Sequence, residues 1–324
     1  YILSVLRWLM KQAVRDLIFI GIFAVLLHVC GNIFILKGNG YGSDVTSFYE
    51  LPDHSLDVVF FGSSHSYTTF SPKIIEEQTG LKSYNFATRQ QPVYITYYYM
   101  VETLKTQSPA YFVLETNMFH ADEEYMSEGV TREALDRMHM SANKIQAIQA
   151  SVEDEEERNS YYLNIMKYHA RYRNLKKEDL ESAFRLKGVD NGGFIGLEKR
   201  DDVVIDNSAY MYITEQKEIS SKNREYADKI IQLARERDIE LIFVKSPCQL
   251  DEEVTMYFNW VKAYAGERGL DYIDLNQKFE ELDLRSGDFY DREHLSESGA
   301  VKASTYFSEY MRNKAAGAVV AGKD

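Results

Sequence analysis

Two regions of the chain share one pattern of apolar and polar residues. Before position 120 and after position 220, short apolar runs such as 56–61 (LDVVFF) and 240–245 (ELIFVK) alternate with longer amphipathic stretches. Short apolar runs bounded by turn residues are typical of buried strands, and the stretches between them are long enough for helices. Strands that alternate with helices form a parallel sheet with right-handed crossovers. The pattern predicts an α/β domain with a five-stranded parallel sheet, built from 56–119 and 221–314.

The region between these two parts has a different pattern. From 120 to 220 the alternation of strands and helices is lost, and 131–152 and 161–175 have helical periodicity. We therefore expect a mainly helical insertion or lid over the carboxyl ends of the strands. The glycine-rich stretch 38–55 is predicted to be a linker, and 315–324 a disordered tail.

An apolar run near the N-terminus predicts a transmembrane helix. Residues 17–36 carry no formal charge, and about twenty residues at ~1.5 Å each span the ~30 Å hydrocarbon core of a bilayer. Arg7, Lys11 and Arg15 precede the run and only Lys37 follows closely, so we expect a cytoplasmic N-terminus and an exported remainder. The length favours a retained single-pass anchor in 1–37 over a cleaved signal.

Composition excludes some partners and cofactors. The net charge of −13 and the pI near 5.1 argue against a nucleic-acid partner. Cys30 and Cys248 do not suggest a disulfide framework. The seven histidines lack metal-ligand spacings, and the sequence has no phosphate-binding loop or dinucleotide fingerprint. We therefore predict no metal and no cofactor.

A candidate nucleophile follows the first predicted strand. Gly62 permits a sharp turn, and Ser64 then stands at the start of a helix, where backbone N–H groups could stabilise an oxyanion. Glycine and serine also fill ordinary strand-to-helix turns, so this motif is weak by itself.

A second motif supplies the groups that a serine nucleophile needs. Asp291 precedes His294 by three residues, just before the last predicted helix. An imidazole can take the serine proton, and a carboxylate can fix its tautomer and stabilise its charged form. Ser64 after the first strand and His294 after the last should meet at the carboxyl edge of the sheet, where such sheets bind ligands.

These motifs resemble those of the SGNH/GDSL hydrolases. The segment 62–64 matches the first block of that family, with serine in place of the usual aspartate, and Asp291 with His294 matches the last. The resemblance covers 56–114 and 240–312 and implies a flavodoxin-like three-layer SGNH fold. Within the family the chain looks most like membrane-anchored bacterial proteins such as DltD and the alginate O-acetyltransferases.

The resemblance adds candidate residues around the nucleophile. Thr88, Arg89 and Gln91 belong to a loop that lines the site in the family, although the expected glycine is missing. Asn117, at the end of the third strand, either donates to an oxyanion or satisfies its own backbone. We expect His65 to shape the pocket, because adjacent residues point in different directions.

Three basic residues of the insertion are candidates for substrate binding. His169, Arg171 and Arg173 could hold an anionic polymer or carrier, since guanidinium groups bind carboxylate and phosphate through two hydrogen bonds. The alternative is that basic residues near a helix end interact with its dipole and with nearby acids.

Together these observations lead to two hypotheses. The first is an extracytoplasmic O-acyltransferase or esterase that acts on a cell-envelope polysaccharide or teichoic-acid-like polymer through an acyl-Ser64 intermediate. The resemblance implies a membrane-bound O-acyltransferase as partner. Transfer and hydrolysis use the same three residues. The second hypothesis is a catalytically silent accessory or polysaccharide-binding protein with this fold, which the poorly matching middle blocks favour.

Overall fold

The computed structural model describes residues 2–35, 45–183 and 191–321. Its centre is a single sheet of five parallel strands in the order β2-β1-β3-β4-β5. The predicted α/β class and the five-stranded parallel sheet are therefore confirmed. The strands are β1 (Val58–Phe61), β2 (Ser83–Asn85), β3 (Tyr111–Glu115), β4 (Glu240–Lys245) and β5 (Asp271–Asp274).

Buried apolar side chains explain why these segments are strands. All four residues of β1 are buried, as are five of the six in β4, which suits strands covered on both faces. The register aligns Val58 of β1 with Ser83 of β2 and Tyr111 of β3, so the carboxyl ends of the strands lie at one edge.

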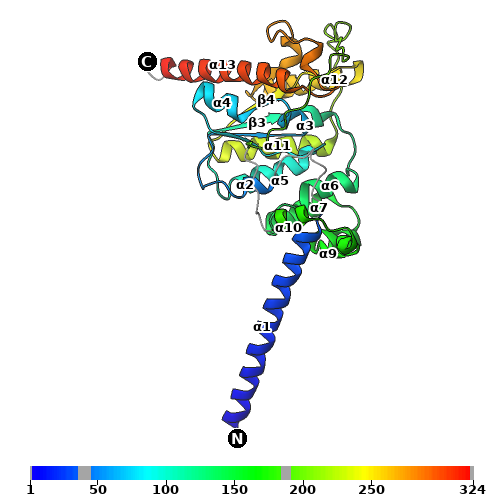
Figure 1. Cartoon of the computed structure of the whole chain (residues 1–324). Coiled ribbons are helices and arrows are strands. Elements are labelled where there is room, and N and C mark those ends of the chain that lie inside the picture. Colours follow the sequence, from blue (N-terminus) through cyan, green and yellow to red (C-terminus); the bar gives the residue numbers. More distant parts are fainter. Residues whose placement is uncertain (1, 36–44, 184–190, 322–324) are drawn as a thin grey trace. The chain divides into compact units, whose positions relative to one another are not determined.

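Helices cover both faces of the sheet (Figure 1). Helices α4 and α13 pack against each other on one face, and α5 and α11 do so on the other. The helices of this domain are α2 (Val45–Phe48), α3 (Ser64–Tyr67), α4 (Pro72–Thr79), α5 (Val93–Thr103), η1 (Asn117–His120), α6 (Glu128–Leu135), α7 (Ala142–Ser151), α11 (Ser221–Glu236), α12 (Glu252–Glu267), η3 (Leu275–Lys278), η4 (Ser286–Asp288) and α13 (Glu297–Ala321).

The segment 120–220 does not form one body. The chain divides into two compact units, of which the larger contains Asn39–Glu153 and Val189–Asp324 and therefore the whole sheet. The smaller contains Tyr1–Gly38 and Asp154–Gly188. Its helices are α1 (Ile2–Phe34), α8 (Glu155–Tyr162), α9 (Ile165–Tyr168), η2 (His169–Arg173) and α10 (Lys177–Ala183).

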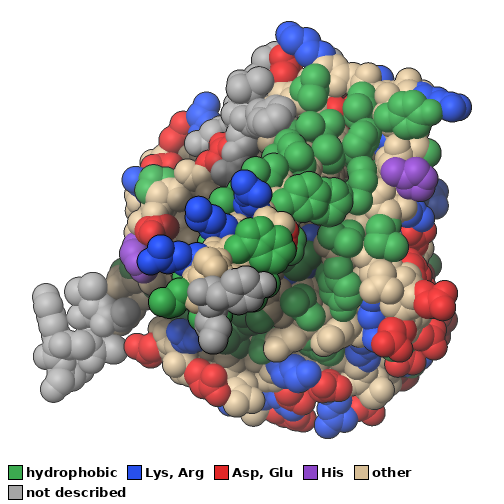
Figure 2. Space-filling view, turned by 90° about the horizontal axis from the view of Figure 1, so that it is seen from below, with side chains coloured by type: hydrophobic (Ala, Val, Ile, Leu, Met, Phe, Trp, Pro, Cys, Tyr) green, Lys and Arg blue, Asp and Glu red, His purple; other side chains and the backbone are tan. Residues whose placement is uncertain are grey.

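Helix α1 is long and apolar enough to cross a membrane, so it could be a membrane anchor or a signal sequence. Most of its large apolar side chains are exposed, and the view from below shows many hydrophobic side chains with lysine and arginine near them (Figure 2). The predicted linker falls partly on 36–44, which lie outside the described residues. Helix α13 continues to Ala321, into the stretch for which the sequence predicts disorder, and 322–324 are not described.

Candidate functional site

The turn after β1 depends on a glycine. Gly62 has a φ of 135°, and a Cβ at this position would lie 2.9 Å from the Cβ of Glu115 on β3. A larger residue would therefore push the ends of β1 and β3 apart. The chain then enters α3, with Ser63 as its N-cap and Ser64 as its first residue. The glycine thus places Ser64 at the carboxyl edge of the sheet.

Ser64 meets the two residues that the sequence pairs with it. The Nε2 atom of His294 lies 2.8 Å from the Ser64 hydroxyl oxygen, across 230 positions of sequence. On the other side of the ring, Nδ1 lies 3.0 Å and 3.1 Å from the carboxylate oxygens of Asp291. If Nδ1 carries the proton, Nε2 is free to accept the hydroxyl proton. This is the geometry of a hydroxyl, a base and an orienting carboxylate.

Hydrogen bonds and buried side chains hold the loop that carries Asp291 and His294. Tyr290 N donates to the carbonyl of His294, and Phe289 forms an antiparallel bridge with Leu295. The Asp291 carboxylate also accepts from the backbone N–H groups of Glu293 and His294, at 2.8 Å and 2.7 Å. Phe289 and Leu295 are buried in the core, so the loop is anchored at both ends.

Charge at this loop favours an ionised carboxylate. Partial burial acts to raise the pKa of Asp291, but the hydrogen bonds and charge of His294 outweigh it and hold the pKa below its ordinary value. Asp291 is therefore charged at neutral pH and can stabilise a protonated His294.

A buried lysine orients the side chain of Asn117. Lys245, the last residue of β4, donates from Nζ to the Asn117 side-chain oxygen at 3.0 Å and to the Ser246 carbonyl at 3.2 Å. Because the amide oxygen faces Lys245, the amide nitrogen faces away from it. Asn117 also lines the pocket at Ser64. Of the two readings that the sequence left open for Asn117, this orientation suits a donor to the pocket.

Glu115 completes this buried group. It is the last residue of β3, and its carboxylate accepts from the backbone N–H of Asn117 at 3.0 Å and of Ser246 at 3.3 Å. Burial raises the pKa of Glu115, and the nearby Lys245 opposes that rise. Neither Glu115 nor Lys245 is a candidate in the sequence analysis. The available signal was a charged residue at the end of each of two buried strands.

The three candidate residues of the loop after β2 bind neighbouring side chains and are not part of the described pocket lining. Thr88 donates to the Gln91 side-chain oxygen at 3.0 Å, and the Gln91 amide donates to Thr96 at 3.0 Å, so both side chains of this pair are engaged within the loop and α5. Arg89 forms an ion pair with Glu133 at 3.2 Å. Gln90, with a left-handed φ of 50°, is the residue of this loop that lines the pocket.

A pocket of about 890 Å³ opens at Ser64. The loops after β1, β3 and β4 contribute to its wall, together with the loop of His294. Its described lining contains five carboxylates and no lysine or arginine: Asp122, Glu123, Asp251, Glu253 and Glu293. Glu253 is paired with Lys217, and the other four carboxylates leave the lining negatively charged, which disfavours an anionic group in this pocket.

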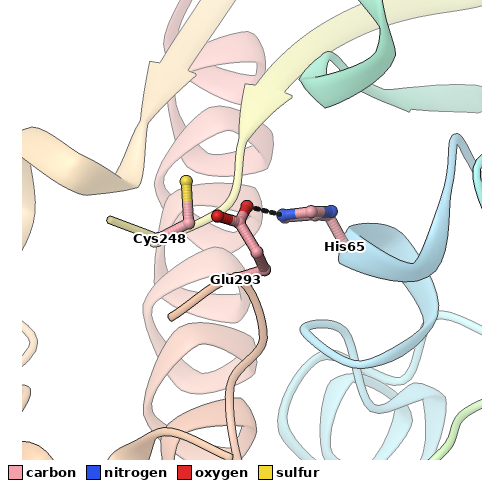
Figure 3. Close-up of side chains that lie close together, drawn as sticks. All are labelled: His65, Cys248 and Glu293. Atoms are coloured by element: carbon pink, nitrogen blue, oxygen red, sulfur yellow. Dashed lines mark ion pairs between the residues drawn. The ribbon is translucent and has the colours of Figure 1, made fainter. Parts of the chain in front are cut away.

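His65, which follows Ser64 in the chain, lines the same pocket. With Cys248 and Glu293 it forms a cluster whose potential metal-ligand atoms lie within 4.8 Å of one another (Figure 3). Its Nε2 lies 3.5 Å from the Glu293 carboxylate and has no hydrogen-bond partner in the described part of the chain. Burial, followed by the charge of Lys245, lowers the pKa of His65 well below its ordinary value, so the ring is neutral.

This cluster is poorly suited to a metal ion. The ammonium of Lys245 lies 3.1 Å from the sulfur of Cys248, and a cation there would repel a second one. Burial raises the pKa of Cys248 in spite of Lys245, whereas metal binding requires the thiolate. We therefore assign no metal to these residues.

The three basic candidates of the insertion belong to the smaller unit. His169 and Arg173 are exposed, and Arg171 is bound to oxygens of that unit. None of the three is part of the described lining of the pocket.

Comparison with known proteins does not assign the chain to a family. No protein-family model matches the chain, and a search of curated proteins finds no match to it.

Proposed function

We propose that this protein is a serine O-acyltransferase or esterase that uses Ser64, His294 and Asp291. The observation that carries the proposal is the distance of 2.8 Å between His294 Nε2 and the Ser64 oxygen, with Asp291 on the far side of the ring. Two segments separated by 230 positions meet with atoms suited to proton transfer, at the edge of the sheet where α/β domains bind ligands.

In the proposed reaction Ser64 attacks the carbonyl carbon of an ester or thioester while its proton passes to His294 Nε2. The tetrahedral intermediate collapses, and the leaving alkoxide or thiolate takes that proton. An acceptor hydroxyl or a water then gives its proton to His294 and attacks the acyl carbon. His294 returns that proton to the Ser64 oxygen as the bond between Ser64 and the acyl group breaks. Asp291 stabilises the imidazolium in both halves of the reaction.

The oxyanion of the intermediate needs hydrogen-bond donors. The backbone N–H of Ser64, at the start of α3, is the first donor, and it belongs to the same residue as the nucleophile. The Asn117 amide nitrogen is a second donor, because Lys245 holds the amide oxygen on the opposite side. Donors fixed in advance stabilise developing charge more effectively than water does.

The resemblance to SGNH/GDSL hydrolases and the character of α1 support a location and a substrate class. We propose that α1 is a retained anchor with a cytoplasmic N-terminus, which would place the pocket outside the cell membrane. A cell-envelope glycopolymer is then the acceptor, and a membrane-bound O-acyltransferase is the expected partner. The acidic lining favours an acyl group without negative charge.

A fluorophosphonate probe tests the proposal on the full chain in detergent. We expect covalent labelling of the wild type and none of Ser64→Ala. Ser66→Ala is the matched control, because Ser66 lies on the same helix and its hydroxyl donates to Asn85 at 3.3 Å. No labelling of the folded wild type, or labelling that survives Ser64→Ala, would contradict the proposal and favour the silent accessory protein.

A further inference from the structure

The last turns of α1 are covered by other residues of the smaller unit. Side chains from Leu17 to Leu26 are all exposed, whereas Leu27, Val29 and Cys30 are half-buried and Gly31 is buried. The covering elements are α9, η2 and α10, which pack against α1. We call the segment from Leu163 to Ala183 the collar. It packs against the last turns of α1.

Arg171 attaches the collar to the end of the helix. One of its nitrogens donates to the carbonyl oxygens of Phe34 and Ile35, the latter at 2.7 Å. The other forms an ion pair of 2.9 Å with Asp179, whose side chain is buried. The last carbonyls of a helix have no partner within the helix, so a guanidinium at this position satisfies acceptors that would otherwise need water.

A transmembrane span that ended before the collar would be too short to cross the bilayer. The uncharged and exposed part of α1, from Leu17 to Leu26, is about 15 Å long at ~1.5 Å per residue, roughly half of the ~30 Å hydrocarbon core. Arg15 can extend toward the cytoplasmic surface by several Å, which does not supply the difference. The covered turns of α1 must therefore account for much of the outer leaflet.

The outer surface of the collar suits such a position. Four large apolar side chains are 45% to 58% exposed, namely Leu163, Met166, Tyr172 and Leu180. Between Leu163 and Lys177 every charged residue is basic, while 153–157 is entirely acidic. Exposed apolar side chains interspersed with lysine and arginine are typical of segments that lie in a membrane interface.

We propose that the collar is embedded in the outer leaflet around α1, with its apolar side chains among the acyl chains and its basic side chains at lipid phosphates. This inference rests on α1 being a retained anchor, as proposed above, and not on the chemistry at Ser64. It gives the collar a function other than that of a lid. It assigns Arg171 to the attachment of the collar, and Arg173 to the membrane rather than to the substrate.

Quenching of tryptophan fluorescence by brominated lipids tests this position. The full chain with Trp8→Phe and Trp260→Phe is reconstituted into nanodiscs of phosphatidylcholine and phosphatidylglycerol, and one tryptophan is introduced at a time. We expect Tyr172→Trp and Leu163→Trp to be quenched several-fold more by lipids brominated near the headgroup than Tyr212→Trp. Tyr212 is 87% exposed and belongs to the larger unit, so it is the matched control.

Phe23→Trp separates the two proposals, because Phe23 is 53% exposed in the middle of α1. Deeply brominated lipids should quench it strongly. Quenching of Phe23→Trp without quenching of either collar variant would overturn the collar proposal and leave the anchor intact. Absence of quenching at Phe23→Trp would overturn both. A collar that escapes quenching but cross-links to another membrane protein in cells would assign this surface to a protein partner instead.

Discussion

Lys245 and Arg171 are two cations that bind oxygen atoms inside the protein, and they do so in different surroundings. Lys245 is fully buried at the end of β4, and its partners come from η1, which follows β3, and from the loop that follows β4. Arg171 is 20% exposed, and its partners are the end of α1 and Asp179 of the collar. Lys245 reaches Asn117 across 128 positions, but Asn117 follows a strand that already pairs with β4. Arg171 joins segments 136 positions apart that no sheet connects.

The difference shows what each cation can control. The ends of β3 and β4 are already held in register by the sheet, so Lys245 decides the orientation of a side chain and leaves the backbone unchanged. The end of α1 belongs to no sheet, so the bonds of Arg171 decide whether a whole segment stays attached. The following predictions test this contrast between an orienting cation and an attaching cation.

The largest effect is expected at the edge of the sheet itself. Asp291→Asn should lower the rate of acyl-enzyme formation with an activated ester such as p-nitrophenyl acetate by on the order of 10⁴-fold, because an amide cannot stabilise the imidazolium. Brominated-lipid quenching at Tyr172→Trp should not change. A rate within tenfold of the wild type would show that Asp291 does not support His294.

Removal of the orienting cation should affect both stability and rate. Lys245→Met leaves the Glu115 carboxylate and the Asn117 oxygen buried without their cation, which we expect to cost about 3 kcal/mol in the free energy of unfolding. Acylation should also fall by roughly 10²-fold, because the Asn117 amide is no longer held. Chemical denaturation and burst kinetics measure the two effects.

A double variant separates the effect on stability from the effect on the acylation rate. Lys245→Met combined with Glu115→Gln removes the uncompensated charge, so most of the stability should return while acylation stays slow. If rate and stability recover together, Lys245 has only a structural role.

Removal of the attaching cation should act on the smaller unit alone. Arg171→Met removes the guanidinium that donates to the carbonyls of Phe34 and Ile35 and that pairs with Asp179, at a cost of about 2 kcal/mol in the attachment of the collar. Hydrogen exchange in 163–183 should become faster, and exchange in β1, β3 and β4 should not. Arg171→Lys should restore part of the protection, because lysine keeps the charge but loses the planar fork. Faster exchange throughout the sheet would contradict this separation.

The same contrast explains what could be read from the sequence. Ser64 and the pair Asp291 and His294 follow from local patterns, namely the end of a buried strand and a loop before a helix, and the parallel topology places both at one edge. That reasoning needs only the chain order of strands and helices. The fold class and the meeting of Ser64 with His294 and Asp291 were accessible for this reason.

The remaining features depend on tertiary contacts that no local pattern encodes. From the sequence, Lys245 is expected to be the polar end of a strand. In the structure its ammonium group is buried and donates to Asn117. Gln90 takes a left-handed conformation that the sequence would assign to glycine. The stretch 161–175 has helical periodicity, which says nothing about packing on α1. Attachment between distant segments is therefore the part that sequence reasoning missed.

A third cation, Lys144, supplies the smallest and sharpest test of the contrast. Its Nζ donates to the carbonyls of Asp136 and Met138, at 3.2 Å and 3.0 Å, but it forms no ion pair with a carboxylate among the described residues. Burial, only partly opposed by the charges of Asp136 and Glu102, lowers the pKa of Lys144 to about 8. The unfolded chain therefore binds the proton more tightly than the folded chain does, from about pH 8 up to the ordinary lysine range.

Stability should rise with pH across this window, because the cost of holding a buried charge is relieved as Lys144 loses its proton. Between pH 7 and pH 9 we expect Lys144 to contribute an increase of about 1 kcal/mol to the free energy of unfolding. Urea denaturation of the wild type and of Lys144→Met at both pH values isolates this increment, which the variant should lack. Lys245→Met combined with Glu115→Gln should retain the increment in full. Equal pH dependence in wild type and Lys144→Met would show that carbonyl oxygens alone keep a buried ammonium charged, and that the carboxylate beside Lys245 is not what distinguishes it.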